Sequence, residues 1–434
     1  MTPPATSRVR DRLRAEVTDA AARAADLVST LPAPADRSPD QQARATSAQV
    51  RARTARRRLL RDQSELLYRE AVGASLRRLS LTDLSYLLAD IVPGLTPNRA
   101  EMEMERGRRQ SAKEGLEIDQ GIASSALLRS GAGADLLRSQ RLPTDEARSR
   151  LAEFQRTGAV EMPVVSVRRT DGVAEITVAN QRYLNAEDEP LGQQLEIAID
   201  LALLDPGVRV GVLRGAVMEH PRYAGRRVFS SGINLSLLCA GQIPFLGFVM
   251  QREMGYLSKI QRGLWDPRQQ ADPTARGGKP WIAVVDGFAI GGGMQLMLTF
   301  DYVISSDTAY FTLPAAREGI VPGAANLRLG RVLGPRLARQ VLLGGRRIGA
   351  REPAAALLCD AVVAEEEVDG AIDEAVHAMD NPAVLANRHM ITAFEEPEDH
   401  LRGYLAEFAE VQVQRLYSQD VLHRLEQQWM QRQR

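Results

Sequence analysis

The sequence is poor in the residues that build covalent crosslinks and metal sites. Cys239 and Cys359 are the only cysteines among 434 residues, which excludes a disulfide framework and any cysteine-rich metal site. The five histidines are scattered, and none belongs to a His-Glu-x-x-His pattern. We therefore expect no resident metal ion.

The chain also lacks an excess of charge of either sign. Its 55 Lys and Arg residues balance its 55 Asp and Glu residues, so neither nucleic acid nor an anionic membrane is indicated as a partner. No apolar run is long enough to span a membrane, and the first residues lack the apolar core of a signal peptide. We expect a cytoplasmic protein of ordinary globular composition, with 44% hydrophobic residues.

Three common functional motifs are missing. The three glycines at 291–293 are not followed by the third glycine of a dinucleotide-binding fingerprint. Gly278-Lys279 is followed by Pro280, not by the Ser or Thr of a P-loop, and no Ser lies in a Gly-x-Ser-x-Gly elbow. The sequence therefore shows no binding motif for a flavin or another nucleotide cofactor.

The first 160 residues carry almost no strand signal. Apolar spacing predicts helices over residues 9–31, 41–79, 98–116 and 133–156, with a break rich in Pro and Asp after Leu31. The Arg-dense segment 51–61 is interpreted as a solvated helix face balanced by acidic residues from elsewhere, with an anion-binding patch as the alternative. This part is expected to form a helical N-terminal domain, residues 1–160.

The pattern changes at Pro163. Two alternating runs flank Asp171-Gly172, which predicts a β-hairpin. A helix is expected over 191–205 and a buried strand over 208–216, and strands and helices alternate as far as Val321. This alternation predicts an α/β fold on a mostly parallel sheet.

The strand signal fades after Leu333, where helices are expected, including residues 350–359 and a long final helix. The final helix carries an apolar stripe that includes Leu401, Leu405 and Phe408. Such a stripe usually packs against the body of the protein or another subunit. We place the domain boundaries at 161–370 for the α/β domain and 371–434 for a C-terminal helical segment.

A glycine-rich turn at residues 286–293 dominates the α/β domain. The buried strand 281–285 ends in Asp286-Gly287, and the triple glycine 291–293 precedes the start of a buried helix at Met294. Glycines before a helix expose backbone N–H groups at the positive end of the helix dipole, which suits a phosphate or a reaction oxyanion. A tight strand-to-helix connection that needs small residues for packing is an equally good interpretation.

A second glycine site lies upstream, at residues 228–235. It follows the strand at 208–216 and precedes a helix, and its sequence is Val-Phe-Ser-Ser-Gly-Ile-Asn-Leu. Two loops of backbone donors at neighbouring strand ends can converge on one oxygen and stabilise an enolate or a tetrahedral oxyanion. Below, residues 228–235 are the first glycine loop and residues 286–293 the second.

With these two loops, residues 163 to about 370 resemble the crotonase (enoyl-CoA hydratase/isomerase) superfamily. The features that carry the resemblance are Arg182, Asn185-Ala186, Phe229–Leu235, Gly287 with the glycines 291–293, Asp301, Phe311 with Pro314, and Gly319–Ala324. The resemblance implies a core of ββα spiral turns, acyl-CoA substrates and a homo-oligomer, a trimer or a dimer of trimers. It also implies that the backbone N–H groups of Ile233 and Gly292 are the two oxyanion donors.

Two positions depart from the pattern of hydratases in this family. Those enzymes use a glutamate three residues after the middle glycine and another after the Phe-x-x-Pro proline, where this chain has Gln295 and Ala315. An amide cannot act as a general base and alanine cannot exchange a proton, so addition of water to a double bond is disfavoured. Glu318, one helical turn further on, is the alternative proton acceptor.

A long helical N-terminal region, a Gln at this position and an extended segment at 239–279 are also found in cofactor-free dioxygenases of this family. These enzymes convert an arylacetyl-CoA and O2 into an arylglyoxylate and CoA. The resemblance implies that no cofactor is needed, since CoA is part of the substrate and O2 is the co-substrate. The α-hydrogen of an arylacetyl thioester is benzylic, so two N–H donors at the oxyanion would make it acidic enough to form the enolate.

The resemblance also directs the choice of substrate-binding residues. Gln295 is expected to orient the α-carbon or a peroxide oxygen, and Glu187 and Arg252 to hold phenol hydroxyls of the substrate. The expected apolar walls of an O2 pocket are Leu235, Leu238, Ile320 and Val321. The residues expected near the CoA moiety are Arg222, Arg227, Ser231 and Asn234, and His220 is a further substrate-binding candidate. Surface ion pairing is the alternative for Glu187 and Arg252.

Two other functions stay open. The first is a different crotonase-type reaction, such as thioester hydrolysis or isomerisation, which would release CoA or product without O2. The second is a non-catalytic acyl-CoA-binding scaffold that uses the helical domain for partners. The intact glycine loops argue against the scaffold.

Overall fold

The computed structural model describes residues 5–73, 78–266 and 278–432, which form two compact units. The first unit comprises Met1–Gln140, Leu235–Met250 and Arg402–Arg434, and the second comprises Arg141–Asn234 and Gln251–Leu401. Both units are therefore assembled from separate stretches of chain. The predicted boundaries at residues 160 and 370 do not coincide with these units, and the three-domain division stays a prediction.

The first unit is helical. Its helices are α1 (Ala5–Ser29), α2 (Pro39–Val72), α3 (Leu81–Ile91), α4 (Arg99–Arg106), α5 (Leu116–Arg129), α6 (Gly133–Ser139), α9 (Leu235–Cys239), the π-helix η4 (Phe245–Met250), most of α17 (Glu398–Leu416), and α18 (Gln419–Arg432). Helix α2 begins where Ser38 and Gln41 form a capping box around Pro39, and it ends at Gly73 with φ of +72°. The expected helical region is confirmed, but two predicted helices are not continuous. The one predicted over 98–116 is broken by a 3-10 turn at Gln110–Ala112, and the one predicted over 133–156 is divided into α6 and α7 (Asp145–Thr157).

The Arg-dense part of α2 is only partly solvated. Arg56 is 8% exposed and, together with Arg53, forms an ion pair with Asp119 on α5. Arg57 pairs with Glu410 on α17 at the surface. The expectation of acidic partners from elsewhere is confirmed. The expectation of a solvated face is wrong at Arg56, because α5 packs against this side of α2.

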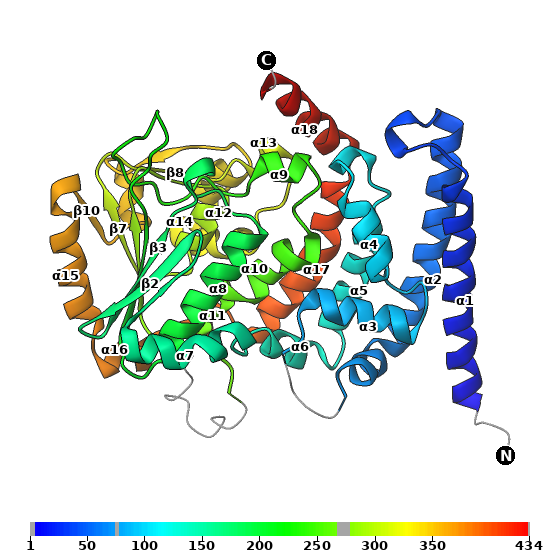
Figure 1. Cartoon of the computed structure of the whole chain (residues 1–434), viewed down its shortest axis with the longest axis horizontal. Helices are drawn as coiled ribbons and strands as arrows, with labels where there is room; N and C mark the ends of the chain where they lie inside the picture. The colour runs from blue at the N-terminus through cyan, green and yellow to red at the C-terminus, as the bar shows by residue number, and fades with distance from the viewer. Residues whose placement is uncertain (1–4, 74–77, 267–277, 433–434) are drawn as a thin grey trace. The chain divides into compact units, whose positions relative to one another are not determined.

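The second unit contains a seven-stranded sheet in the order β1-β2-β3-β4-β5-β7-β10. Its strands are β1 (Ala159–Glu161), β2 (Val165–Thr170), β3 (Val173–Val178), β4 (Val210–Gly215), β5 (Trp281–Val285), β7 (Tyr302–Ser306) and β10 (Ala361–Val363). Figure 1 labels β2, β3, β7 and β10 of this sheet. Strands β1, β2 and β3 pair antiparallel, and the strands from β3 to β10 pair parallel. A second sheet contains β6 (Phe288–Ile290), β8 (Tyr310–Thr312) and β9 (Ile348–Gly349).

The predicted hairpin is confirmed. Thr170 pairs with Val173, and the two residues between them, Asp171 and Gly172, have φ of +51° and +87°. Positive φ at both central residues is the geometry of a type I′ turn, for which Asp-Gly is favoured.

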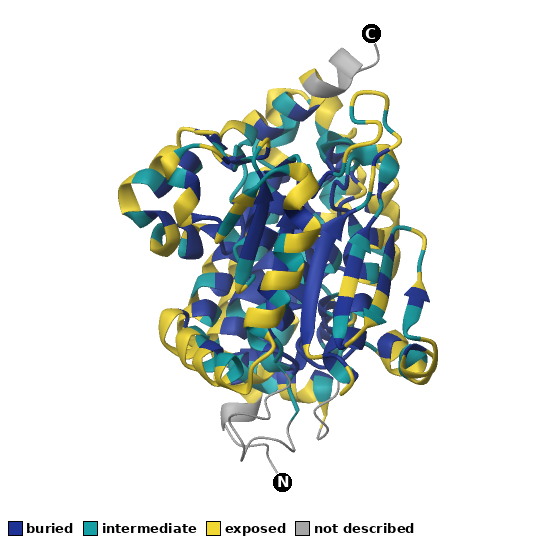
Figure 2. Ribbon diagram, turned by 90° about the vertical axis from the view of Figure 1, so that its left-hand side faces the viewer, coloured by how far each residue is buried: buried dark blue, intermediate teal, exposed yellow. Residues whose placement is uncertain are grey.

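Both faces of the large sheet are covered. On β5, Trp281, Ala283 and Val285 belong to the main hydrophobic core with residues of α8 (Glu189–Leu204), α11 (Tyr256–Arg262), α12 (Gly292–Met297) and α14 (Ala325–Leu342). Ile282 and Val284 point to the other face, where α15 (Val368–Met379) contributes Val368 and Ala375. Figure 2 shows the strands of the large sheet as a dark blue layer behind α15. A strand buried on both faces explains the continuous apolar run at 281–285.

The chain after Leu333 is less helical than expected. The predicted helix at 350–359 is a short 3-10 helix, Pro353–Leu357, and the strands β9 and β10 flank it. The predicted long final helix is divided into α17 and α18 at residues 417–418. Helix α7 (Asp145–Thr157) lies in the second unit, and α16 (Pro382–Glu395) carries the exposed side chains of Met390, Ile391 and Phe394. Strands of two or three residues are too short to show an alternating pattern, so the sequence does not reveal them.

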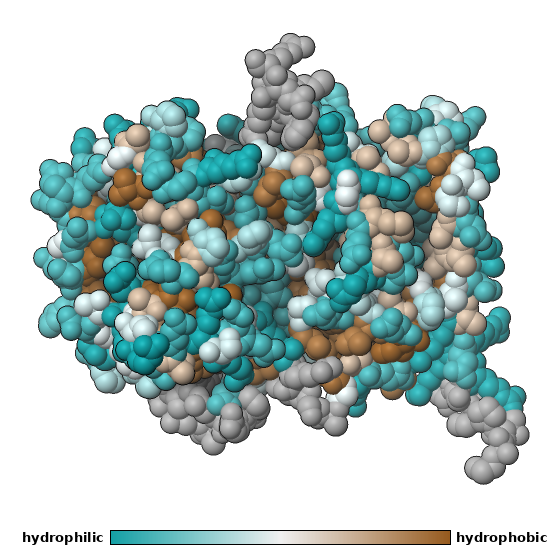
Figure 3. Space-filling model, viewed as in Figure 1, coloured by the Kyte–Doolittle hydropathy of each residue, from teal (hydrophilic) through white to brown (hydrophobic). Residues whose placement is uncertain are grey.

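Hydrophilic residues dominate the face drawn in Figure 3, with hydrophobic residues interspersed among them. In the described part of the chain, no helix has both the length and the apolarity needed to cross a bilayer.

One core position tests the packing of the sheet. A Cβ added at Gly211 on β4 would overlap the fully buried indole ring of Trp281 on β5. We expect Gly211→Ala to lower the free energy of unfolding by about 1–3 kcal/mol, because neither strand can move away. Gly330→Ala on α14 is the matched control, since its Cβ would meet no atom within 4 Å, and it should stabilise by up to about 1 kcal/mol. Denaturant unfolding of both variants measures this, and equal losses would contradict the packing argument.

Candidate active site

The site begins at the turn after β3. Leu184 and Asn185 have φ of +52° and +55°, and the Asn185 side chain is 1% exposed. Its oxygen accepts from the backbone N–H of Asn180 at 2.8 Å, and its amide donates to the Val228 carbonyl at 2.7 Å. Asn185 therefore links the turn at residues 180–185 to the start of the first glycine loop by hydrogen bonds, and this fixes the position of Glu187.

Glu187 joins the first glycine loop through its backbone. Its N–H donates to the Gly232 carbonyl at 2.7 Å, and its carbonyl accepts from the Asn234 N–H at 2.8 Å. These two bonds form a parallel bridge between Glu187 and Ile233. Such a bridge does not use the N–H of Ile233.

A different structural feature favours glycine at each of the positions 291, 292 and 293. Gly291 has φ of +51°, a conformation that favours glycine. A Cβ at Gly292 would lie 2.6 Å from a carboxylate oxygen of Glu187, and a Cβ at Gly293 would lie 2.7 Å from the Cβ of Ser230. The packing interpretation of this motif is therefore correct for Gly293, and Gly292 is small because the Glu187 carboxylate lies against it.

The two glycine loops are in contact. Ser230 forms a parallel bridge with Ala289 on β6, and a Cβ at Gly232 would lie 3.1 Å from the Gly292 nitrogen. No described residue accepts a hydrogen bond from the N–H of Ile233 or of Gly292. The loops predicted to converge thus lie together, with both of these N–H groups unused by the described protein atoms.

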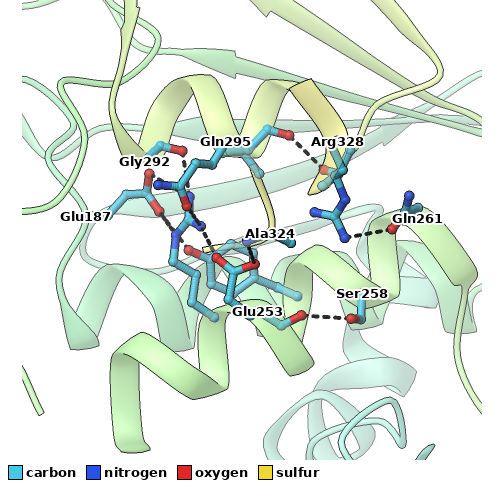
Figure 4. A network of polar contacts seen from close by, with 12 residues as sticks. Glu187, Glu253, Ser258, Gln261, Gly292, Gln295, Ala324 and Arg328 are labelled. Carbon is cyan, nitrogen blue, oxygen red and sulfur yellow. Dashed lines mark hydrogen bonds and ion pairs between the residues drawn. The ribbon is translucent and has the colours of Figure 1, made fainter. Parts of the chain in front are cut away.

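Arg252 on α10 (Gln251–Met254) is the centre of a buried polar network. Figure 4 labels its partners Glu187, Glu253, Gly292 and Gln295. The Arg252 side chain is 2% exposed and uses all five N–H groups. Nε and one Nη donate to the two oxygens of Glu187 at 2.6 and 3.3 Å. The same Nη donates to the Gly292 carbonyl at 2.6 Å, and the other donates to Glu253 at 3.0 Å and to Gln295 at 2.9 Å.

Burial and local charges shift the pKa values of Arg252 and Tyr256 in this network. Burial alone would lower the pKa of Arg252, but the Glu187 carboxylate, Tyr256 and the Glu253 carboxylate raise it well above its ordinary value. Burial and the Glu187 charge raise the pKa of Tyr256, although Arg252 opposes the shift, and its hydroxyl donates to Glu187 at 2.8 Å. Both shifts favour the protonated forms, in which Arg252 is a cation and the Tyr256 hydroxyl is a hydrogen-bond donor.

The side chain of Gln295 belongs to this network through its oxygen and keeps its Nε2 as a hydrogen-bond donor. Its side-chain oxygen accepts from Arg252, and no described residue accepts from its Nε2. The amide hydrogens are thus left to donate to another molecule. Among the residues predicted for the site, the structure brings together Glu187, Ile233, Arg252, Gly292 and Gln295.

The other predicted residues lie in different surroundings. The Ser231 hydroxyl donates to the Tyr183 carbonyl at 2.9 Å, and the Asn234 amide lies 3.5 Å from the Asp188 carboxylate. Ile320 and Val321 are half-buried in the turn after α13 (Ala315–Glu318). Leu235 and Leu238 belong to α9 in the first unit, so their place in an O2 pocket stays a prediction.

The basic candidates lie near a separate cavity of about 170 Å³. Its lining includes Arg226, Arg227, Arg347, Tyr310 and Phe288, and the Arg347 guanidinium lies 3.4 Å from the centre of the Tyr310 ring. Arg222 is exposed, and the His220 side chain accepts from the Arg222 backbone N–H at 3.3 Å. Strand β6 runs from Phe288 in the cavity wall towards Gly291 in the second glycine loop.

Ala315 and Glu318 complete the comparison with the hydratase pattern. Ala315 is buried in the main core, and the half-buried Glu318 has a pKa raised by burial. The alternative role of Glu318 as proton acceptor stays a prediction.

Sequence reasoning missed Glu253, Tyr256 and Gly323. Glu253 is 3% exposed and accepts from Arg252 and from the Ala324 N–H, and Gly323 lies directly against it. Tyr256 follows Arg252 by four residues, a spacing that places two side chains on one helix face. That spacing was the available signal, whereas nothing in the sequence connects Glu253 with residues 323–324.

Comparison with known proteins places this architecture in a family. Residues 168–421, more than half of the chain, match the enoyl-CoA hydratase/isomerase family. The chain belongs to this family, the crotonase superfamily. An enoyl-CoA hydratase of Mycobacterium avium subsp. paratuberculosis K-10 aligns with a TM-score of 0.50 at 24% identity, over 62% of this chain and 99% of that one, which supports the crotonase-type α/β fold.

Among curated proteins, the chain is 50% identical to the (3,5-dihydroxyphenyl)acetyl-CoA 1,2-dioxygenase of Amycolatopsis orientalis. That similarity extends over 407 residues, 93% of each chain. The carnitinyl-CoA dehydratase of Escherichia coli K12 is 32% identical over 183 residues, which cover 42% of this chain and 61% of that protein. The similarity to the dioxygenase therefore includes the helical first unit as well as the family domain.

Within the described ranges, no group of three or more His, Cys, Asp or Glu residues is arranged to hold a metal ion.

The buried network predicts a large effect of removing its cation. Arg252→Met leaves the carboxylates of Glu187 and Glu253 buried without their counter-charge, so we expect a loss of about 3–5 kcal/mol of unfolding free energy. Arg346→Met is the control, because Arg346 pairs with Glu352 at 3.2 Å on the surface, and its loss should be below about 1 kcal/mol. Denaturant unfolding distinguishes the two, and similar losses would show that the network does not depend on the Arg252 charge.

Proposed function

We propose that this protein is a dioxygenase that converts (3,5-dihydroxyphenyl)acetyl-CoA and O2 into (3,5-dihydroxyphenyl)glyoxylate and CoA. One observation carries the proposal. The two glycine loops of the family are intact and in contact, while the hydratase glutamates are replaced by Gln295 and Ala315. The 50% identity over 93% of the dioxygenase of Amycolatopsis orientalis supports the assignment of substrate and reaction. We further propose that the reaction serves glycopeptide antibiotic biosynthesis of the vancomycin type, by supplying the precursor of dihydroxyphenylglycine.

The first step is loss of an α-hydrogen as a proton. The N–H groups of Ile233 and Gly292 donate to the thioester oxygen as it becomes an enolate oxyanion. Each such donor contributes roughly 3–4 kcal/mol in comparable sites. The benzylic position of the α-carbon lowers the remaining barrier, so the chain needs no electron-withdrawing cofactor to form the carbanion.

The second step consumes O2. The enolate carbon forms a bond to one oxygen atom, and the peroxide's terminal oxygen attacks the thioester carbonyl and expels CoA as a thiolate. Cleavage of the O–O bond then gives the α-ketone and the carboxylate. Two oxygen atoms enter the product, and the two α-hydrogens leave as protons, so no external reductant or oxidant other than O2 is required.

The network assigns different roles to the polar residues. Gln295 donates through Nε2 to a peroxide oxygen or orients the α-carbon. Glu187 accepts from a phenol hydroxyl through a remaining lone pair, because its two oxygens accept three hydrogen bonds from Arg252 and Tyr256. Arg252 has no N–H left for the substrate, so it acts by positioning Glu187 and Gln295. Ile320, Val321, Leu235 and Leu238 are proposed to keep the O2 pocket apolar.

Assembly is proposed by the same resemblance. We expect a homo-oligomer, a trimer or a dimer of trimers, in which the C-terminal helical segment contributes to the contacts. The exposed Phe394 on α16, 77% accessible, supports this role.

Oxygen uptake tests the proposed function. Protein treated with a chelator and dialysed should consume O2 with (3,5-dihydroxyphenyl)acetyl-CoA and release one CoA per O2, measured with an oxygen electrode and a thiol reagent. Gln295→Ala should reduce the rate by about 100-fold, since a preorganised hydrogen-bond donor is lost at the reacting atoms. CoA release without O2 uptake would identify a thioesterase instead, and absence of both would contradict catalysis on this substrate.

The arginines around the cavity are proposed to hold the CoA phosphates. Removing one charged hydrogen-bond donor costs about 1.5–3 kcal/mol, so Arg227→Ala and Arg347→Ala should raise KM by roughly 10- to 100-fold and leave kcat nearly unchanged. The effect should disappear with a substrate truncated to its pantetheine thioester. Arg168→Ala, on the exposed face of β2, is the control, and an equal change in this variant would exclude the cavity as the phosphate site.

A further inference from the structure

Glu253 lies between the Arg252 guanidinium and the turn at residues 321–324. One carboxylate oxygen accepts from an Nη of Arg252 at 3.0 Å, and the other accepts from the Ala324 N–H at 3.1 Å. The Glu253 carbonyl accepts from the Ser258 hydroxyl at 2.7 Å, which holds the start of the side chain in place (Figure 4). The side chain of Glu253 is 4% exposed, so water does not compete for either oxygen.

The turn at residues 321–324 packs closely against the Glu253 carboxylate. Gly323 has φ of +42°, and a Cβ at this position would overlap a carboxylate oxygen of Glu253 and lie 2.9 Å from the side-chain oxygen of Gln295. A side chain at position 323 would therefore meet both acceptors of the same Arg252 Nη, the Glu253 carboxylate and the Gln295 side-chain oxygen. The turn also carries Val321, whose carbonyl accepts from the Gly323 N–H at 3.1 Å.

We propose that Glu253 is a positioning residue for the oxygen-dependent half of the proposed reaction. By holding one Nη of Arg252 and the Ala324 N–H, it fixes the Gln295 amide and the Ile320–Val321 turn. The other guanidinium nitrogens are held by Glu187 and the Gly292 carbonyl and do not depend on Glu253. The proposal rests on the proposed function, and it assigns Glu253 to the O2 step rather than to enolate formation.

A carboxylate is required at this position because both of its partners are donors. A glutamine offers one acceptor and one donor, so it cannot satisfy the Arg252 Nη and the Ala324 N–H together. An aspartate retains two acceptors on a shorter side chain. Glu253→Gln should therefore impair the site more than Glu253→Asp, although Gln is the closer match in size.

Two measurements separate the halves of the reaction. Exchange of the substrate's α-hydrogens with D2O under anaerobic conditions, followed by mass spectrometry, reports enolate formation at Ile233 and Gly292. O2 consumption with CoA release reports the later steps. For Glu253→Gln we expect exchange within about threefold of wild type and O2 consumption reduced by about 100-fold, the size of effect that a displacement near 1 Å produces. Glu253→Asp should recover part of the O2 rate.

Glu196→Gln is the matched control, because Glu196 is also buried but pairs with Lys259, which keeps Asp200 as a second partner. It should leave the ratio of exchange to O2 consumption unchanged. Gly323→Ala should give the same ratio of hydrogen exchange to O2 consumption as Glu253→Gln. Its effect on O2 consumption should be smaller in a Glu253→Ala background, because the carboxylate that the new Cβ would overlap is then absent. Parallel loss of exchange and O2 consumption in Glu253→Gln, or retention of both, would overturn the proposal.

Failure of the proposed function is recognised separately, as absence of O2 consumption by the wild type. The positioning role is then decided by crystal structures of wild type and Glu253→Gln. We expect the Arg252–Glu187 pair to persist and the Gln295–Arg252 bond to be lost. Retention of the Gln295–Arg252 bond in the variant would overturn the role of Glu253 whatever the reaction.

Discussion

A buried guanidinium held between two carboxylates is the interaction on which the rest of the site depends. Glu187, Arg252 and Glu253 are each no more than 3% exposed, and desolvating each ion costs several kcal/mol. Five N–H groups that meet five acceptors offset that cost, and Tyr256 adds a further donor to Glu187. Glu187 pairs through its backbone with the first glycine loop, and Arg252 binds the Gly292 carbonyl, so the Glu187–Arg252 pair holds both loops. Donors fixed in advance need no reorganisation when an oxyanion forms.

The network also explains why an amide suits position 295. A glutamate there would place a third carboxylate beside a guanidinium that already serves two. The Gln295 oxygen accepts from Arg252 without adding charge, and its nitrogen remains a donor. The substitution that removes a hydratase's general base therefore fits the electrostatics of the whole site. In this chain the site's buried carboxylates are Glu187 and Glu253, and both pair with Arg252.

Much of the fold follows from local patterns. The Asp171-Gly172 turn, the doubly buried strand β5 and the helical first unit were all predictable, because turn chemistry and hydrophobic period are properties of neighbouring residues. Strands β9 and β10 were not predictable, because each is defined by a partner strand rather than by its own two or three residues. The burial of Arg56 was missed for the same reason, since Asp119 is distant in sequence.

By itself, the sequence determined the family, the two glycine loops and the absence of the hydratase glutamates, because these features depend on residue identity at fixed spacing. It also indicated Glu187, Arg252 and Gln295 as site residues, but as separate contacts to a substrate. Only the tertiary structure decided that every side-chain N–H of Arg252 donates to another protein group, and that Glu253 and Gly323 belong to the site. The physical reason is that hydrogen-bond saturation depends on three-dimensional neighbours contributed by four separate stretches of chain.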